Sequence, residues 1–132
     1  MATGGLEKIT INLGLVDLGQ IDLLVQEGFY ANRTDFFRTA IRNQLAAHAE
    51  EVRRTVVRKE LVLGLQRHTR SDLEAVRARG ETLQIKVLGL ASIADDVPPE
   101  LAQATIDSDV VLGAFRASPS VKAALEGRVR SS

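Results

Sequence analysis

The chain has 132 residues, of which 45% are hydrophobic and 26% are charged, so it can form one ordinary domain or two very small ones. Its 17 basic and 17 acidic side chains give no net charge. The absence of cysteine excludes disulfides and thiolate metal sites. No apolar run approaches the roughly 20 residues that span a bilayer, and the first six residues lack the pattern of a secretory signal. We therefore expect a cytoplasmic protein without a membrane segment.

Residues 6–13 read LEKITINL and alternate between apolar and polar side chains. A period of two predicts a half-buried β-strand with one aliphatic face. That face is formed by Ile9, Ile11 and Leu13. The opposite face carries three hydrogen-bonding groups, those of Lys8, Thr10 and Asn12.

Two helices are predicted to follow this strand. Asp17 has the position of an N-cap before apolar residues at helical spacing, and Gly28 would end that first helix. Asn32 is the expected N-cap of the second helix, and Asp35 complements that cap. Alanines extend the helical pattern to about Val52.

One strand and two short helices cannot enclose a core, and a lone strand cannot satisfy its backbone hydrogen-bonding groups. A second copy of the chain solves both problems, because the two strands can pair while the helices interlock. The pattern therefore predicts a homodimer.

The order of these elements, with the run GFYANRTDFFRTAIR at residues 28–42, resembles the ribbon-helix-helix DNA-binding family over residues 6–52. In that family two paired strands lie in the major groove, and their outward side chains read base edges. The resemblance implies that the bases are read by Lys8, Thr10 and Asn12. It also implies that phosphate is bound at the amino end of the second helix, by Asn32, Arg33 and Thr34.

Each of these assignments has a simpler alternative. Asn32 and Thr34 could serve only to cap the second helix. The polar side of the strand could be an ordinary solvated surface. Asp17, Asp22, Glu27 and Asp35 also equal in number the basic residues within residues 8–42, so DNA affinity would depend on a few contacts per dimer and on cooperative binding.

The remaining residues alternate between strand-like and helical patterns. β-Branched and aliphatic residues predict three strands, at residues 55–65, 82–93 and 110–117. Prolines introduce two predicted short helices, at residues 100–105 and 120–127. We expect the last five residues to be frayed.

The tripeptide Val-Leu-Gly occurs three times in this half, starting at Val62, Val87 and Val111. A strand that recurs with glycine at a fixed place suggests stacked coils or a small β-layer that needs neighbours to bury its faces. Chance recurrence of so short a sequence is the alternative.

The polar residues of the chain give no enzyme motif and no cofactor site, so we predict that the protein is not an enzyme. His48 and His68 are the only histidines, and both are expected to be ordinary surface residues rather than metal ligands. The remaining acidic pairs are expected to lie in turns, and these are Asp95 with Asp96 and Asp107 with Asp109.

The predicted fold class is α+β, with a ribbon-helix-helix domain at residues 1–54 that forms an intertwined dimer. A small β-rich domain with short helices, at residues 55–132, would support oligomerisation or regulation. The function that this organisation favours is a sequence-specific transcriptional repressor that binds double-stranded DNA at the nucleoid. Its C-terminal half would join the dimers into tetramers or larger assemblies.

Two other functions remain open. An antitoxin would bind DNA with the same fold and neutralise a toxin with its C-terminus, but such tails are commonly disordered when free. The apolar, strand-like composition of residues 55–132 argues against such a tail. A self-assembling structural polymer tethered to DNA is the other alternative.

Overall fold

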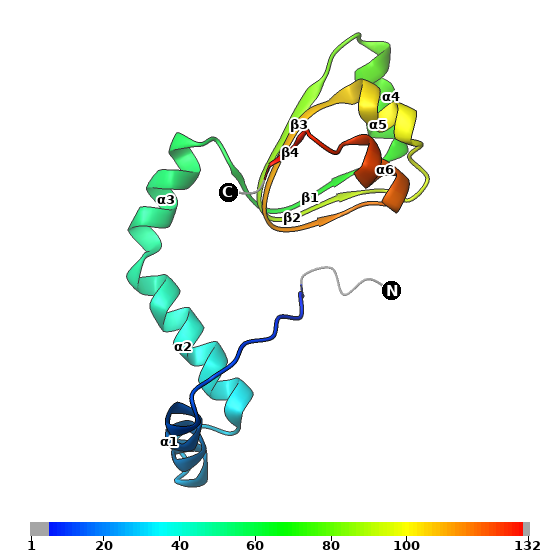
Figure 1. The fold of residues 1–132 in the computed structure, drawn as a ribbon. Helices are drawn as coiled ribbons and strands as arrows, with labels where there is room; N and C mark the ends of the chain where they lie inside the picture. Colours follow the sequence, from blue (N-terminus) through cyan, green and yellow to red (C-terminus); the bar gives the residue numbers. More distant parts are fainter. Residues whose placement is uncertain (1–5, 131–132) are drawn as a thin grey trace. The chain divides into compact units, whose positions relative to one another are not determined.

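The computed structural model describes residues 6–130, and within this range the chain forms six helices and a four-stranded sheet. The predicted α+β class is therefore confirmed. The chain divides into two compact units. The N-terminal unit is Lys8–Thr55, and the C-terminal unit consists of the chain from Val56 onward together with Leu6 and Glu7. Figure 1 shows the elements of both units in sequence colours.

The N-terminal unit contains three helices, which are α1 (Leu15–Gln26), α2 (Arg33–Ala47) and most of α3 (Ala49–Arg58). The prediction that Asp17 caps the first helix is wrong, because the N-cap is Gly14 and Asp17 lies in the first turn. Gly28 ends α1 as predicted. It has φ of +87°, and the amides of Gly28 and Phe29 donate to the carbonyls of Val25 and Leu24 in a Schellman motif.

The segment that precedes α1 is not a strand in the single chain. Residues 6–14 have no regular secondary structure, and all four strands of the described chain pair with one another elsewhere. The strand predicted for residues 6–13 is therefore absent from the isolated protomer. A strand is defined by its hydrogen bonds to a neighbour, and this segment has no neighbouring strand unless a second chain supplies one.

The second helix begins as the sequence predicts. The Asn32 side chain accepts a hydrogen bond from the Asp35 amide at 2.8 Å, and the Asp35 carboxylate accepts one from the Ala31 amide at 2.9 Å. Helical structure nevertheless continues through α3 to Arg58, so no strand begins at residue 55. The low helix propensity of valine and threonine costs only a few tenths of a kcal/mol per residue. Extension of a helix that has already formed does not carry the cost of nucleation, so these residues can continue α3.

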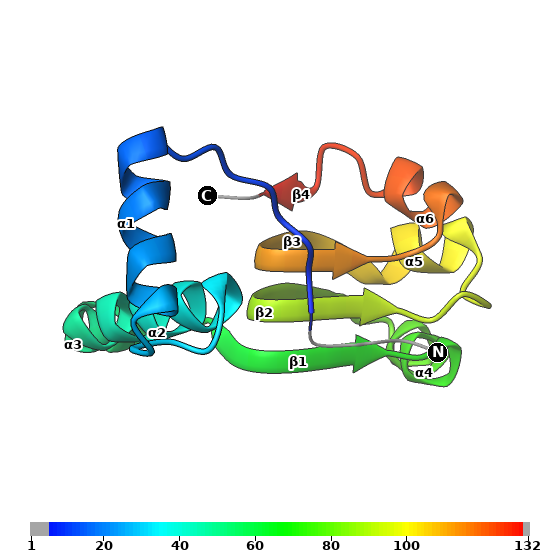
Figure 2. The ribbon, with the colours of Figure 1, turned by 90° about the horizontal axis from the view of Figure 1, so that it is seen from below.

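The C-terminal unit is a parallel sheet with a helix in each connection. Its strands, in their spatial order, are β1 (Val62–His68), β2 (Leu83–Ile93), β3 (Ile106–Arg116) and β4 (Val129–Arg130). The helices are α4 (Arg70–Ala78), α5 (Pro99–Thr105) and α6 (Pro119–Ala124). In Figure 2 the arrowheads of β1, β2 and β3 lie at the same end of the sheet. This parallel arrangement needs the crossover connections that the helices provide.

The core of this unit lies between the three helices and one face of the sheet. Leu73 of α4, Leu101 of α5 and Val121 of α6 are buried against that face. The face itself contributes Ile85 and Val87 of β2, both with no exposed surface. The opposite face, which we call the open face, carries side chains of intermediate exposure on β2.

Most elements predicted for this half are present. The strands at residues 82–93 and 110–117 match β2 and β3, although β3 begins earlier, at Ile106, and the first strand begins only at Val62. The two predicted helices match α5 and α6. Of the tail expected to fray, Val129 and Arg130 instead form β4, while residues 131–132 lie outside the described residues.

Helix α4 is absent from the elements predicted above. Its start is a reciprocal capping box, in which the Thr69 hydroxyl accepts from the Asp72 amide at 3.1 Å and the Asp72 carboxylate accepts from the Thr69 amide at 3.0 Å. Leu73 and Val76 are the buried residues of this helix. The Thr-x-x-Asp spacing was a readable N-terminal signal.

The three Val-Leu-Gly sequences stack in register. Val62 pairs with Val87 and Val87 with Val111, so the glycines at positions 64, 89 and 113 form a column across the sheet. All three glycines have positive φ, between +120° and +140°. The sequence repeat is therefore a structural repeat.

Candidate nucleic-acid interface

The six residues assigned to DNA contacts all lie in the N-terminal unit and are all exposed. Three of them are on the extended segment before α1: Lys8, Thr10 and Asn12. The other three are consecutive at the start of α2, where Asn32 is the N-cap and Arg33 and Thr34 are the first helical residues. All six side chains are open to solvent, although the Asn32 side chain already caps α2.

The apolar residues of the extended segment are exposed as well. The exposed fractions are 76% for Ile9, 63% for Ile11 and 38% for Leu13. On α2, Ile41 and Leu45 are 54% and 60% exposed. Among the residues of α1, α2 and α3, Ile21 alone is buried. The N-terminal unit of a single protomer therefore has amphipathic elements but almost no core.

The start of α2 combines several groups that attract phosphate. The first amides of a helix have no preceding carbonyl to bind, and the helix dipole makes this end positive. A shallow hollow lies here, lined by Ala31, Asn32, Thr34, Asp35, Arg38 and Arg42. Arg38 and Arg42 are one turn apart and add two cations, while the Asp35 carboxylate offsets part of that charge. Such a site is chemically able to hold a phosphate group of a DNA backbone.

Arg33 is engaged in an ion pair that sequence reasoning did not identify. Its Nε and Nη2 atoms each donate to a carboxylate oxygen of Asp22, at 2.8 Å in both cases. These hydrogen bonds lower the pKa of Asp22 below its ordinary value. Arg33 and Asp22 are 11 positions apart on different helices, so no local spacing predicts the pair. The Nη1 atom of Arg33 takes no part in the pair and keeps its N–H groups for a further acceptor.

Two predictions for polar residues outside this unit are wrong. Asp109 lies within β3 rather than in a turn, and it has no exposed surface. Neither of its carboxylate oxygens has a hydrogen-bond partner among the described residues. Burial raises the pKa of Asp109 to about 6. Asp107 also lies in β3 and not in a turn, although it is exposed.

His68 is not an ordinary surface residue either. It ends β1, is half-buried, and its Nε2 atom is buried without a partner among residues 6–130. Burial lowers the pKa of His68, and the nearby Asp72 carboxylate partly opposes that shift. His48 is exposed, as expected, at the junction of α2 and α3. Asp95 and Asp96 lie in the predicted turn.

Two further features of the described residues bear on possible sites. No helix between residues 6 and 130 is both long enough and apolar enough to cross a membrane. Within the same range, no three histidine or acidic side chains gather in a way that could hold a metal ion.

Comparison with known proteins gives one match. Residues 4–122 match the model of a family described as the Ribbon-Helix-Helix transcriptional regulator family. This match includes both the N-terminal helices and most of the C-terminal sheet. No curated protein and no solved structure matches the chain.

Proposed function

The chain belongs to the Ribbon-Helix-Helix transcriptional regulator family, a family of DNA-binding proteins that typically form dimers, and from this premise we propose that it is a sequence-specific repressor. As a homodimer it reads the major groove with a two-stranded ribbon built from residues 6–13 of each chain. It acts as a binding protein rather than an enzyme, on double-stranded DNA in the cytoplasm.

One observation carries the proposal: an exposed extended segment whose apolar and polar side chains alternate. Ile11 is 63% exposed, and its two sequence neighbours are the polar residues Thr10 and Asn12. When two such segments pair antiparallel, their aliphatic sides face the helices and become a shared core. Their polar sides then face outward together. This arrangement accounts for both the missing strand and the missing core of the single protomer.

The polar side of the proposed ribbon has suitable chemistry for base edges. A lysine ammonium can donate to guanine, an asparagine amide can pair bidentately with adenine, and a threonine can meet either a base or a thymine methyl. The start of α2 would assist the ribbon by binding the sugar-phosphate backbone of the DNA. Its amides and the Nη1 atom of Arg33 would bind phosphate without regard to sequence.

The experiment that tests the proposal compares Asn12→Ala with Arg33→Ala on a selected operator and on random duplexes over a range of salt concentrations. We expect Asn12→Ala to lose about 1–3 kcal/mol of discrimination at particular base pairs. We expect Arg33→Ala to weaken binding to all sequences and to flatten the dependence of affinity on salt. Fluorescence anisotropy of labelled duplexes measures both effects.

Asn43→Ala is the matched control, because Asn43 is exposed on α2 but lies away from its amino end. This variant should bind like the wild type. If Asn12→Ala weakens binding to operator and random DNA equally, base reading by that residue is wrong.

We further propose that the C-terminal unit joins dimers into tetramers or larger assemblies through the free edge of β1. Leu63 and Leu65 on this edge are 68% and 70% exposed, and Val62 is 45% exposed. Val87 and Val111, which occupy the position of Val62 in the other two repeats, are only 0% and 7% exposed. β1 is an edge strand, paired only with β2, and an added strand from a second copy would reduce the exposure of these side chains. Exposed apolar edges of this kind favour pairing with another chain.

A further inference from the structure

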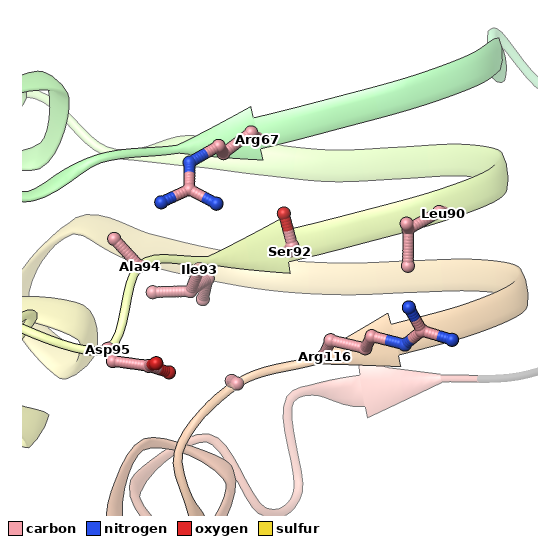
Figure 3. A pocket seen from close by; sticks show the side chains of 8 residues that line it. Arg67, Leu90, Ser92, Ile93, Ala94, Asp95 and Arg116 are labelled. Carbon is pink, nitrogen blue, oxygen red and sulfur yellow. The ribbon is translucent and has the colours of Figure 1, made fainter. Parts of the chain in front are cut away.

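The open face of the sheet carries one polar row near the carboxyl ends of its strands. Arg67 of β1 pairs in register with Ser92 of β2, which pairs with Arg116 of β3. Side chains at paired positions on adjacent strands project from the same face of a sheet. Figure 3 shows these three side chains on their three strands. Two guanidinium groups therefore flank a hydroxyl group across the sheet.

This row lines a hollow. Its other lining residues are Leu90, Ile93, Ala94, Asp95 and Ala117. Leu90 lies two residues before Ser92 on the same face, so it contributes an apolar wall. Asp95, from the turn after β2, is the one acidic residue among them (Figure 3). Ligands of parallel sheets commonly bind outside the carboxyl ends of the strands, which is where this hollow lies.

The two arginines differ in what they bind. Arg67 has no hydrogen bond or ion pair among residues 6–130. The Nη2 atom of Arg116 donates to the carbonyl oxygen of Leu6 at 3.0 Å and to a carboxylate oxygen of Glu7 at 2.9 Å. Arg116 is thus already placed to hold a carboxylate, and the Glu7 side chain that supplies it is 62% exposed.

We propose that this hollow binds a small dianion, of the phosphate or dicarboxylate kind, between Arg67 and Arg116. The two strands that carry the arginines are separated by β2 and lie roughly 10 Å apart, a gap that two long arginine side chains can close around a small ligand. The Ser92 hydroxyl donates a third hydrogen bond. Two guanidinium groups favour a doubly charged ligand because each can neutralise one charge and donate in parallel.

Binding of such a ligand at Arg116 displaces Glu7. Glu7 immediately precedes Lys8, the first residue of the polar side of the proposed ribbon. A dianion therefore competes for Arg116 with Glu7, which lies in the segment proposed to form the ribbon. This coupling rests on the proposed DNA-binding function, whereas binding of the dianion does not.

The test uses the full chain without DNA, titrated by calorimetry with sodium phosphate and, separately, with sodium succinate. Sodium chloride at matched ionic strength is the blank. We expect saturable binding of at least one anion, and a loss of about tenfold or more in affinity for both Arg67→Gln and Arg116→Gln. Arg77→Gln, which removes the same charge from the exposed face of α4, should leave the affinity unchanged. Comparison of the two anions distinguishes a phosphate ligand from a carboxylate ligand.

Glu7→Gln provides a change in the opposite direction. Removing the competing carboxylate should tighten dianion binding several-fold, and an unchanged affinity would overturn the competition.

The proposed site is wrong if neither anion binds above the chloride blank, or if Arg77→Gln weakens binding as much as the other two variants. It is equally wrong if Arg67→Gln and Arg116→Gln reduce affinity for duplex DNA and leave the anion titrations unchanged. DNA binding by the wild type is measured independently, so failure of this site leaves the repressor proposal intact.

Discussion

At the scale of single residues, Asp109 is the clearest conflict with ordinary burial. A carboxylate that is buried without hydrogen-bond partners is costly, and this cost favours the protonated form of the group. Burial raises the pKa of Asp109 to about 6 from its ordinary value of 3.8. Because the folded-state pKa is the higher one, the folded chain binds this proton more tightly than the unfolded chain. Stability from this group is present below pH 4 and is lost as the pH rises to about 6.

Asp109→Asn should therefore stabilise the protein at pH 8, where the wild type must bury a charge. We expect a gain of about 1–3 kcal/mol in the free energy of unfolding at pH 8 and a clearly smaller gain at pH 4.5, where the folded carboxyl is mostly protonated. Thermal unfolding followed by circular dichroism, at one protein concentration and both pH values, measures this difference.

Asp107→Asn is the control for that measurement, since Asp107 lies on the same strand and is exposed. It should change stability equally little at both pH values. An Asp109→Asn variant whose gain is the same at pH 4.5 and pH 8 would show that titration of Asp109 is not the cause.

At the scale of elements, the glycine column determines how closely the strands of the repeat approach. A Cβ atom on Gly89 would overlap the backbone carbonyl of Gly64, whereas one on Gly64 would meet no atom within 4 Å. Both glycines have positive φ, so alanine at either position carries backbone strain. Of these two positions, only Gly89 adds a clash to that strain.

Gly89→Ala should therefore destabilise the protein more than Gly64→Ala does. Strain of about 1–2 kcal/mol is expected in both variants, and the displaced β1 backbone should add about 1–3 kcal/mol in Gly89→Ala. Urea unfolding of the two variants at the same protein concentration gives the comparison. Equal losses in the two variants would contradict the close approach of β1 and β2 at this position.

The elements that the sequence predicts best are those with local signals. Asn32 and Gly28 mark helix ends through groups within a few residues of each other, and β2 shows its alternation directly. The errors have more than one cause, because α4 has a local start signal whereas the burial of Asp109 has none. Residues 55–58 look like a strand but continue a helix, and Asp109 looks like a turn residue because a polar side chain gives no sign of being enclosed.

The candidate sites follow the same rule. Residues 8, 10 and 12 are exposed, but so are the apolar residues between them, so their role in reading bases stays a prediction. The Arg33–Asp22 pair joins two helices and has no sequence signature. The Val-Leu-Gly repeat did indicate which strands stack, but the meeting of Arg67, Ser92 and Arg116 depends on a register that only the folded sheet defines.

At the scale of the whole molecule, the two units differ in which part of their structure is left uncovered. The C-terminal unit has a closed core and an exposed strand edge at β1, whereas the helices of the N-terminal unit bury only Ile21. We therefore expect two levels of assembly. At the first level two N-terminal units form a dimer, and their folding depends on it. At the second level the C-terminal units join dimers into larger assemblies. Two substitutions can separate these levels, because Ile11 lies on the proposed ribbon and Leu65 lies on the free edge of β1.

Ile11→Asp places a charge in the proposed shared core and should abolish dimerisation together with the helical signal of the N-terminal unit. Leu65→Lys places a charge on the β1 edge and should reduce larger assemblies to dimers that still bind DNA. Sedimentation velocity at several concentrations, with circular dichroism on the same samples, measures both outcomes.

Gln84→Lys adds the same charge as Leu65→Lys on an exposed position of β2 and should leave the assembly as in the wild type. A folded, monomeric Ile11→Asp protein would contradict the intertwined dimer, because its helices would then be stable without the aliphatic side of a second chain. Larger assemblies that survive Leu65→Lys would place their contacts away from β1 and leave the dimer unaffected.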